Sequence, residues 1–185
     1  MAELDILKEL IKDDSIVPLH ICKDANKGTI ELIEPDCPTS KVTIYGVPPE
    51  SIVIKVDNFR SPNSIFAGTK SECKRADYVI ILDCARKKRI LYIEMKKTKD
   101  SERHIIAQLK GAVCFIDYCK SIAYLFWGER NFLNGFEPRF VSFAHTGIPK
   151  KPTRVICDHP VHDTPERMKK IHSPNKPQFN HIIGA

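Results

Sequence analysis

The strongest constraint on this chain is a pair of short apolar runs that a β-hairpin would explain. Residues 78–82 (YVIIL) and 90–95 (ILYIEM) are rich in Ile, Leu, Val and Tyr, which favour strands. Between them lies the short basic segment of residues 85–88, which is unsuited to the interior of a strand. The pattern therefore predicts two antiparallel strands joined by a tight loop.

The pairing of such a hairpin decides which side chains share a face of the sheet. If Cys84 pairs with Arg89 across a four-residue loop, Asp77 lies directly opposite Lys96. Because side chains alternate between the faces, Asp77, Glu94 and Lys96 then project from one face, with opposed Cβ atoms about 5 Å apart. A register shift of two residues keeps the three together, whereas a shift of one separates them. Any loop with an even number of residues predicts this cluster.

Two carboxylates and an ammonium on one face have a specific chemical use. Carboxylate oxygens hold Mg²⁺ while leaving coordination positions for water and for a phosphate oxygen. The cation polarises the phosphorus centre and lowers the pKa of its water, and a nearby lysine orients that water or neutralises the developing charge. The cluster thus indicates metal-assisted phosphodiester hydrolysis. The alternative is that Tyr92, Glu94 and Lys96 form only the solvated face of an amphipathic strand.

The motif of Asp77, sixteen intervening residues and then Glu94-Met95-Lys96 resembles that of the PD-(D/E)XK superfamily of restriction-endonuclease-like nucleases. The resemblance implies that Asp77 and Glu94 bind Mg²⁺, or Mn²⁺ as a substitute, together with the backbone carbonyl of Met95. It also implies that Lys96 serves the attacking water. Ala76 stands at the position where the superfamily often has proline.

Other residues are candidates through the same resemblance. Asp57 followed by Glu72-Cys73-Lys74 satisfies the same letters, but that segment lacks the apolar run of a supporting strand, so we favour the first match. Gln108, on the expected helix after the second strand, is an accessory candidate because the exonuclease-like branch has a glutamine there. The tyrosine that follows four residues later in that branch is Ala112 in this chain. Glu9, on an N-terminal helix, is the second accessory candidate.

The expected order of elements is that of the resembled fold. Apolar residues at helical spacing predict a helix from Glu3 to about Lys12 and a second one that begins at residue 100 or 101. Strands are expected at residues 29–34, 41–45, 51–57, 121–127 and 139–145. A long loop near the substrate is expected at residues 59–74. The resemblance implies an α/β fold with a restriction-endonuclease-like αβββαβ core, a mixed sheet flanked by helices, over about residues 1–146.

The composition changes from Pro149 onward. Six of the 13 prolines and four of the seven histidines fall in residues 149–185, with seven basic residues against three acidic ones. We therefore expect a nuclease-like domain at residues 1–148 and an extended, basic C-terminal tail at residues 149–185 that binds nucleic acid. In the alternative, Phe179, Ile182 and Ile183 dock on the domain or on a second subunit.

The distribution of charge favours a polyanionic partner. The net charge is +6, and between residues 86 and 99 seven basic residues face the single Glu94. The expected nucleic-acid-binding residues are Arg86, Lys87, Lys88, Arg89, Lys97 and Lys99. In the alternative, residues 86–89 are only a solvated hairpin tip.

Cysteine usage and hydropathy indicate a cytoplasmic protein. The seven cysteines form no CxxC pair, which suits reduced thiols, and no apolar run reaches the 18 residues of a membrane span. The stretch Cys157-Asp158-His159 with His162 offers three potential zinc ligands and lacks a fourth at the usual spacing.

The sequence as a whole predicts a Mg²⁺-dependent nuclease of repair, recombination or defence, with DNA favoured over RNA. Its selectivity would come from the structure of the nucleic acid, from a homodimer or from a partner subunit. Two alternatives are a non-catalytic nucleic-acid-binding module of the same fold and a zinc-stabilised interaction protein built around Cys157.

Overall fold

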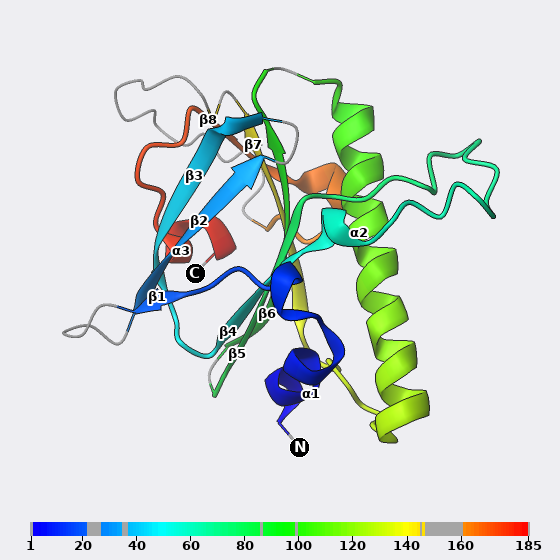
Figure 1. Cartoon of the computed structure of the whole chain (residues 1–185). Helices are drawn as coiled ribbons and strands as arrows, with labels where there is room; N and C mark the ends of the chain where they lie inside the picture. Colours follow the sequence, from blue (N-terminus) through cyan, green and yellow to red (C-terminus); the bar gives the residue numbers. More distant parts are fainter. Residues whose placement is uncertain are drawn as a thin grey trace.

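Two β-sheets and one long helix form the framework of this protein (Figure 1). A computed structural model describes residues 2–21, 27–34, 37–85, 87–98, 100–144, 146 and 161–184. The α-helices are α1 (Glu3–Leu10), α2 (Glu102–Ile122) and α3 (Phe179–Ile183). Shorter helical turns are η1 (Asp13–Ser15), η2 (Val56–Asn58), the π-helical η3 (Ala123–Trp127) and η4 (Pro165–Arg167).

The strands form one antiparallel sheet and one mixed sheet, so this is a mixed α/β protein. The three-stranded sheet has the order β1 (His20–Ile21), β2 (Gly28–Glu34) and β3 (Cys37–Val47). The five-stranded sheet has the order β4 (Ser51–Lys55), β5 (Tyr78–Cys84), β6 (Lys87–Lys96), β7 (Glu137–Ala144) and β8 (Lys169–His172). Its first three strands are antiparallel, and β7 and β8 are parallel to β6.

The predicted hairpin is present as β5 and β6, with a shorter loop than expected. Cys84 pairs with Lys87, so the loop has two residues and the expected pairing of Cys84 with Arg89 is wrong by two positions. Every residue from Tyr78 to Leu82 is buried, because packing covers both faces of this central strand. That double burial explains why the sequence shows a continuous apolar run where a half-exposed strand would alternate.

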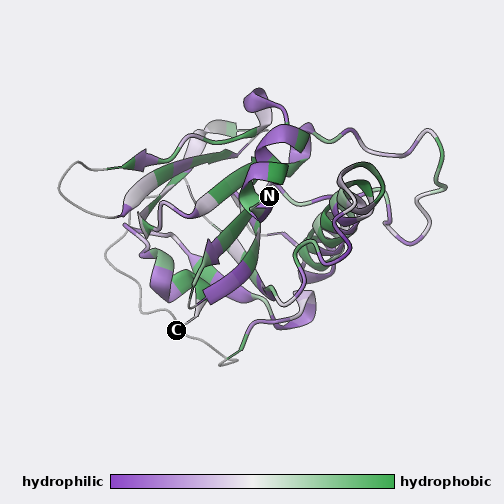
Figure 2. Cartoon of the chain, turned by 90° about the horizontal axis from the view of Figure 1, so that it is seen from below, coloured by the Kyte–Doolittle hydropathy of each residue, from purple (hydrophilic) through white to green (hydrophobic). Residues whose placement is uncertain are grey.

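The two faces of the five-stranded sheet pack against different partners. One face lies under α1 and α2, where Val79, Ile81 and Tyr92 meet Leu109 of α2 within one apolar cluster. The opposite face packs against the three-stranded sheet. Figure 2 shows the apolar residues concentrated on the strands between these layers. The α2 face is the one that receives Asp77 and Glu94.

Helix α2 begins as predicted and continues further than predicted. The side chain of Ser101 caps it by accepting a hydrogen bond from the backbone N–H of His104 at 3.3 Å. The strand expected at residues 121–127 is wrong, since α2 runs into η3 and stops at Gly128, whose φ is +73°. No described helix has both the length and the apolar character needed to cross a bilayer.

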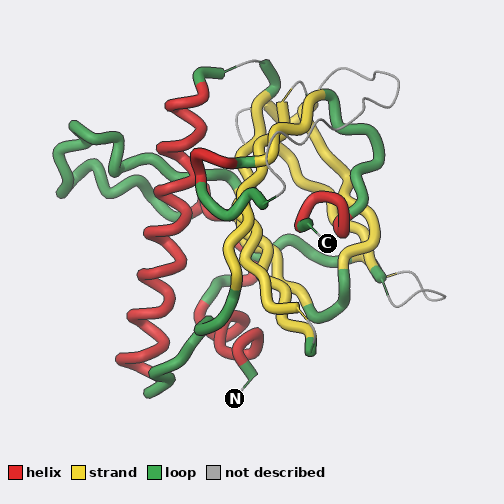
Figure 3. Tube along the Cα trace, turned by 180° about the vertical axis from the view of Figure 1, so that it is seen from behind, coloured by secondary structure: helices red, strands yellow, loops and turns green. Residues whose placement is uncertain are grey.

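The expectation of an extended tail is wrong for residues 161–184. These residues form η4, β8 and α3, and β8 is the edge strand next to β7. Figure 3 shows α3 close to the three-stranded sheet, and Phe179, Ile182 and Ile183 join the apolar cluster between the two sheets. The docking alternative is therefore the correct one for this end of the chain.

Candidate active site

Three polar side chains meet where β5 begins and β6 ends. Asp77 directly precedes β5, and Glu94 and Lys96 lie at the C-terminal end of β6, two residues apart. Tyr78 pairs with Ile93, so the next step of the register places Asp77 opposite Glu94 instead of Lys96. The two-residue shift preserves the shared face, because an even shift does not change the side on which a side chain lies. The structure thus brings the predicted trio together.

Short contacts join these residues across the hairpin. The Nζ atom of Lys96 lies 2.6 Å from Oε1 of Glu94. The backbone N–H of Met95 donates to Oδ2 of Asp77 at 2.7 Å, which holds the Asp77 carboxylate against the β6 backbone. The side chain of Met95 belongs to the apolar cluster on the opposite face of the sheet. Met95 therefore positions Asp77 with its backbone, and its role as a metal ligand through its carbonyl stays a prediction.

Burial shifts the titration of both carboxyl groups. Glu94 is 0% exposed and Asp77 is 8% exposed. Desolvation raises the pKa of Asp77 to about 7, against the opposing effects of the Met95 N–H and the Lys96 charge. Desolvation and then the charge of Asp77 raise the pKa of Glu94 well above its ordinary value. Both groups are costly to ionise until a positive charge arrives.

Lys96 is the positive neighbour that the chain itself supplies. Burial by itself would lower the pKa of Lys96, but the attraction of Glu94 outweighs it, and the pKa is raised. The ammonium therefore stays charged across the physiological pH range. Its side chain keeps 22% of its surface exposed, so Lys96 lies between the buried Glu94 and the solvent.

Buried oxygen atoms of Glu94 and of two other residues, Asp57 and Gln108, have no hydrogen bond of good geometry. Among the described residues, neither carboxylate oxygen of Glu94 receives a hydrogen bond of good geometry, although Oε1 has its ion pair with Lys96. Oδ1 of Asp57 and Oε1 of Gln108 are buried and without a donor as well. Buried acceptors without donors are rare in native proteins. Such a set of hard oxygen acceptors fits a divalent cation.

The described residues contain no ready-made cage of three or more His, Cys, Asp or Glu ligands. Mg²⁺ does not need such a cage, because it usually keeps several waters and takes only one or two carboxylates from the protein. Asp77 and Glu94 supply that number.

Gln108 is directed at the sheet by its position on α2. It lies three residues after Ile105 and four before Ala112, both of which are buried against the sheet. This accessory candidate thus shares the α2 face of the sheet with the trio.

Glu9 does not reach the trio. Its Oε2 accepts a hydrogen bond from the indole N–H of Trp127 at 3.0 Å. Trp127 follows the C-terminal end of α2, whereas Lys96 precedes the N-terminal end of that helix (Figure 1). The contact ties α1 to η3, which is a structural role at the far end of the molecule.

The basic hairpin tip is also distant from the carboxylates. Lys87 lies seven residues before Glu94 on the same strand, which corresponds to about 23 Å. Lys88 lies 3.3 Å from Asp83 and 5.0 Å from the centre of the Phe136 ring. These residues do not surround the site with positive charge.

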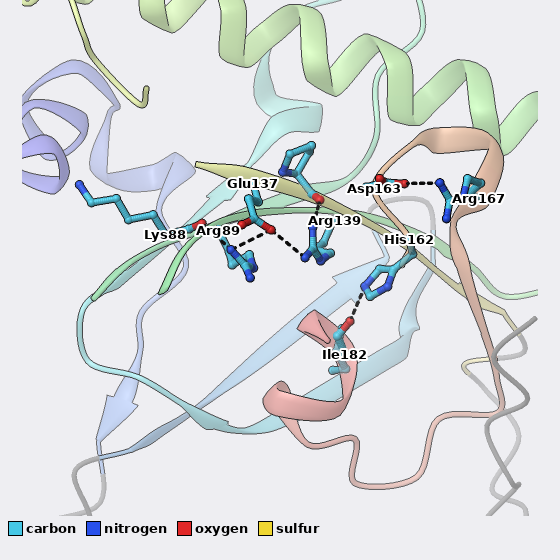
Figure 4. Close-up of polar contacts among 9 residues, drawn as sticks. Lys88, Arg89, Glu137, Arg139, His162, Asp163, Arg167 and Ile182 are labelled. Atoms are coloured by element: carbon cyan, nitrogen blue, oxygen red, sulfur yellow. Dashed lines mark hydrogen bonds and ion pairs between the residues drawn. The ribbon is translucent and has the colours of Figure 1, made fainter. Parts of the chain in front are cut away.

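Figure 4 shows that the tip is bound into a network of ion pairs. Arg89 and Arg139 lie 3.1 Å and 3.0 Å from the same carboxylate oxygen of Glu137. Of the other basic candidates, Lys97 is exposed directly after Lys96, and Arg86 and Lys99 lie outside the described residues. Of the four predicted nucleic-acid-binding residues in the described part of the chain, Lys97 is the one that adjoins the trio in the sequence.

Four residues near the trio were missed by sequence reasoning. Oδ2 of Asp100 lies 4.0 Å from Nζ of Lys96 and 3.5 Å from Nδ1 of His104. The charges of Asp57 and Glu34 are close enough to raise the pKa of Asp77. The position of Asp57 could have been inferred from the sequence. Asp57 follows β4, and because β4 runs antiparallel to β5, the end of β4 lies near Asp77 at the start of β5. Glu34 belongs to the separate three-stranded sheet, and no pattern in the sequence predicts that it lies near Asp77.

No family model, curated protein or solved structure matches this chain.

Proposed function

We propose that this protein is a metal-dependent nuclease that hydrolyses phosphodiester bonds, with DNA preferred over RNA. The observation that supports it most is the buried pair Asp77 and Glu94, whose carboxyl groups lie beside Lys96 on one face of the hairpin. Two neighbouring buried carboxyl groups are costly to ionise, so packing alone does not favour them at these positions.

The order of the elements supports a restriction-endonuclease-like core. Helix α1, strands β4, β5 and β6, helix α2 and strand β7 follow one another as αβββαβ. In this proposal β1, β2 and β3 are an insertion after the first helix, and β8 and α3 are a C-terminal addition.

Asp77 and Glu94 would hold Mg²⁺ or Mn²⁺, with the carbonyl of Met95 as a further candidate. When bound, the cation would supply positive charge to two carboxyl groups whose ionisation burial disfavours, and it would polarise the phosphate that is cleaved. The oxygens without donors on Glu94, Asp57 and Gln108 are the atoms that a cation and its waters would satisfy.

The chain's own groups have separate tasks in this reaction. The N–H of Met95 fixes the Asp77 carboxylate, so its free oxygen does not have to be ordered when the substrate arrives. Lys96 stays protonated, and its partly exposed ammonium can donate to the attacking water or to a phosphate oxygen. Packing of α2 over the sheet keeps bulk water away from Glu94.

A cleavage assay tests the proposal. The parental chain and the variants Asp77→Asn, Glu94→Gln and Lys96→Met are incubated with labelled linear, nicked and branched DNA and with RNA, in Mg²⁺, Mn²⁺ or EDTA. Loss of either carboxylate should slow cleavage by about 10³-fold or more, and loss of the lysine by about 10²-fold.

A matched control is available in the three-stranded sheet. Glu31 and Lys41 form an exposed pair with 3.0 Å between charged atoms, so Glu31→Gln and Lys41→Met change the same charges without touching the site. Both controls should cleave at the parental rate. Cleavage that survives in EDTA or in Glu94→Gln would overturn the assignment, and DNA binding without any cleavage would make the protein a non-catalytic binding module.

A further inference from the structure

An arm of residues 59–75 extends away from the sheets, past α2. Figures 1, 2 and 3 show it from three directions as a long double-backed loop beyond the helix. It connects β4 and η2 to β5, so both of its ends lie beside Asp77. The proposed chemistry does not use it.

The base of the arm is fastened to the body of the protein by side-chain contacts. The ring of Phe59 packs on the rings of Phe115 and Tyr118 of α2, with centroids 5.4 Å and 6.1 Å away. The guanidinium of Arg75 donates to the carbonyl of Asp57 at 3.2 Å and 3.3 Å. These contacts join the two ends of the arm to the helix and to η2.

The backbone of the arm is also fixed along its length. A Cβ at Gly111 of α2 would lie 1.6 Å from the carbonyl oxygen of Lys74, so the two backbones touch here. Ser61 donates to the carbonyl of Cys73 at 2.8 Å, which closes the neck of the arm. The Glu72 carboxylate accepts from two backbone N–H groups of the loop, at 2.9 Å and 2.8 Å. The conformation of the arm is therefore held by specific contacts.

Two adjacent apolar side chains of this arm face the solvent. Ile65 is 83% exposed and Phe66 is 55% exposed. Single exposed apolar residues are ordinary, whereas these two are adjacent and belong to a fastened arm, so they offer an apolar surface to another molecule.

Positively charged side chains lie next to the arm, and they favour a negatively charged partner. A pocket of about 510 Å³ opens between the arm and the N-terminal half of α2. Its basic lining consists of Lys70, Arg103, His104 and Lys110. Lys110 is paired with Glu166 at 2.6 Å, whereas Lys70 and Arg103 form no ion pair with a described residue. The one acidic residue of the lining, Glu72, already accepts backbone hydrogen bonds.

One residue of the pocket lining lies close to a neighbour of the candidate active site. This residue is His104, and its Nδ1 lies 3.5 Å from Asp100, which lies 4.0 Å from Nζ of Lys96. For DNA held in the pocket to reach Asp77 and Glu94, its backbone must pass the His104 end of the pocket.

We propose that the arm is a wedge for duplex DNA. Lys70 and Arg103 bind the phosphates of one strand, and Ile65 and Phe66 insert between two base pairs beside the site. This inference rests on the proposed nuclease function and specifies its substrate as distortable DNA. Apolar wedges of this kind kink a duplex by about 20–90° at a cost of a few kcal/mol, and phosphate contacts offset that cost. Mismatched, nicked or branched DNA costs less to open and should be preferred.

Unstacking of the bases can be measured without cleavage. The full chain in EDTA is titrated into short duplexes that contain 2-aminopurine, whose fluorescence rises when it is unstacked. The parental protein should raise the fluorescence several-fold and more strongly in a mismatched duplex. The double variant Ile65→Ser with Phe66→Ser should lose this rise and bind about 10-fold more weakly. The double variant Lys70→Ala with Arg103→Ala should lower the log-log salt slope of binding by about 1.8, or 0.9 for each phosphate contact.

A matched control has the same chemistry at another place. Leu125 and Phe126 of η3 are 71% and 78% exposed, and Leu125→Ser with Phe126→Ser should leave fluorescence and binding unchanged. If the arm variant raises the fluorescence as the parental chain does, or if the parental chain binds and gives no rise, the wedge is overturned while the nuclease proposal stands. A parental chain that binds no nucleic acid at all would overturn both.

Discussion

At the scale of single residues, Glu94 combines complete burial with a carboxylate that receives no good hydrogen bond. Removing an ionisable group from water costs several kcal/mol, and one neighbouring ammonium returns only part of it. The metal-free fold therefore bears a penalty that a cation would relieve. This penalty is itself measurable.

Glu94→Gln should stabilise the metal-free protein by about 1 to 3 kcal/mol, because the raised pKa of Glu94 makes folding at neutral pH take up a proton, whereas the amide needs none and its oxygen can still accept from Lys96. Urea unfolding at neutral pH in EDTA gives this value. The control Glu31→Gln, at an exposed position, should change stability by less than about 0.5 kcal/mol. A Glu94→Gln variant that unfolds more easily than the parental chain would show that the carboxylate contributes to packing.

His162 provides a pH-dependent prediction. The ring is 2% exposed, and its Nε2 lies 2.8 Å from the carbonyl of Ile182, so Nε2 must carry the proton and donate (Figure 4). Desolvation, together with the charges of Lys169 and Arg139, lowers the pKa of His162 to about 4, against the opposing effects of the hydrogen bond to Ile182 and the charge of Asp163. The neutral form therefore belongs to the folded state.

The sign of the effect follows from the lowered pKa. Between pH 6.5 and 4, His162 is protonated in the unfolded chain and neutral in the folded chain. The free energy of unfolding therefore falls as the pH falls through this window. His162→Gln retains a donor for Ile182 but does not titrate. Relative to this variant, the parental chain should lose about 2 kcal/mol of unfolding free energy between pH 7.5 and 5. A pH-independent difference would contradict the burial of a neutral imidazole.

At the scale of elements, the sequence predicted those helices and strands whose formation depends on residues close together in the chain. The hairpin and the start of α2 were predictable because apolar runs, helical spacing and a capping serine act over a few residues. The trio Asp77, Glu94 and Lys96 followed from the period of two along a strand. The exact pairing was not predictable, because it depends on whether residues 87 and 88 join the strand or the loop.

Other elements depended on contacts that the sequence does not show locally. Residues 121–127 have the aromatic and apolar content of a strand, yet they continue α2, because no helix-breaking residue occurs before Gly128. Asp100 and His104 were invisible as site residues because their proximity to Lys96 depends on how the chain turns from β6 into α2. Sequence reasoning thus identified the centre of the site and missed its surroundings.

The contact between α2 and the arm gives the next prediction. Alanine normally stabilises a helix by about 1 kcal/mol relative to glycine. At Gly111 the new Cβ would collide with the Lys74 carbonyl at 1.6 Å, so Gly111→Ala should instead destabilise the protein by about 2 kcal/mol or more. The control Cys114→Ala, at an exposed position on the same helix, should be nearly neutral. Thermal unfolding distinguishes them, and a stabilised Gly111→Ala would show that the arm does not rest on α2.

At the scale of the whole molecule, the C-terminal segment completes the structure. Strand β8 extends the five-stranded sheet, and α3 fills the space between the two sheets. Its basic, proline-rich composition predicted an extended tail. That prediction is wrong because α3, which contains Phe179 and Ile182, packs against β3, more than a hundred residues earlier in the chain. Composition alone cannot show such long-range contacts.

Phe179→Ala should therefore cost about 3 to 5 kcal/mol, since Phe179 is 1% exposed in the core between the sheets. The loss should lower Tm by roughly 10 °C for a chain of this size. Phe126→Ala is the matched control, because Phe126 is 78% exposed and should cost less than about 0.5 kcal/mol. Equal melting temperatures for the Phe179 variant and the parental chain would restore the view that this segment is a dispensable tail.

If the buried carboxylates of Asp77 and Glu94 exist to hold a divalent cation, the metal-free chain must bind one. Titration with Mn²⁺, followed by the electron paramagnetic resonance signal of the free aquo ion, measures this directly. The parental chain should remove one equivalent of Mn²⁺, Mg²⁺ should compete for the site, and Lys96→Met should retain it. Asp77→Asn and Glu94→Gln should each weaken binding by at least about 10-fold, because each removes a ligand charge. Mn²⁺ binding that is as tight in Glu94→Gln as in the parental chain would contradict the metal site.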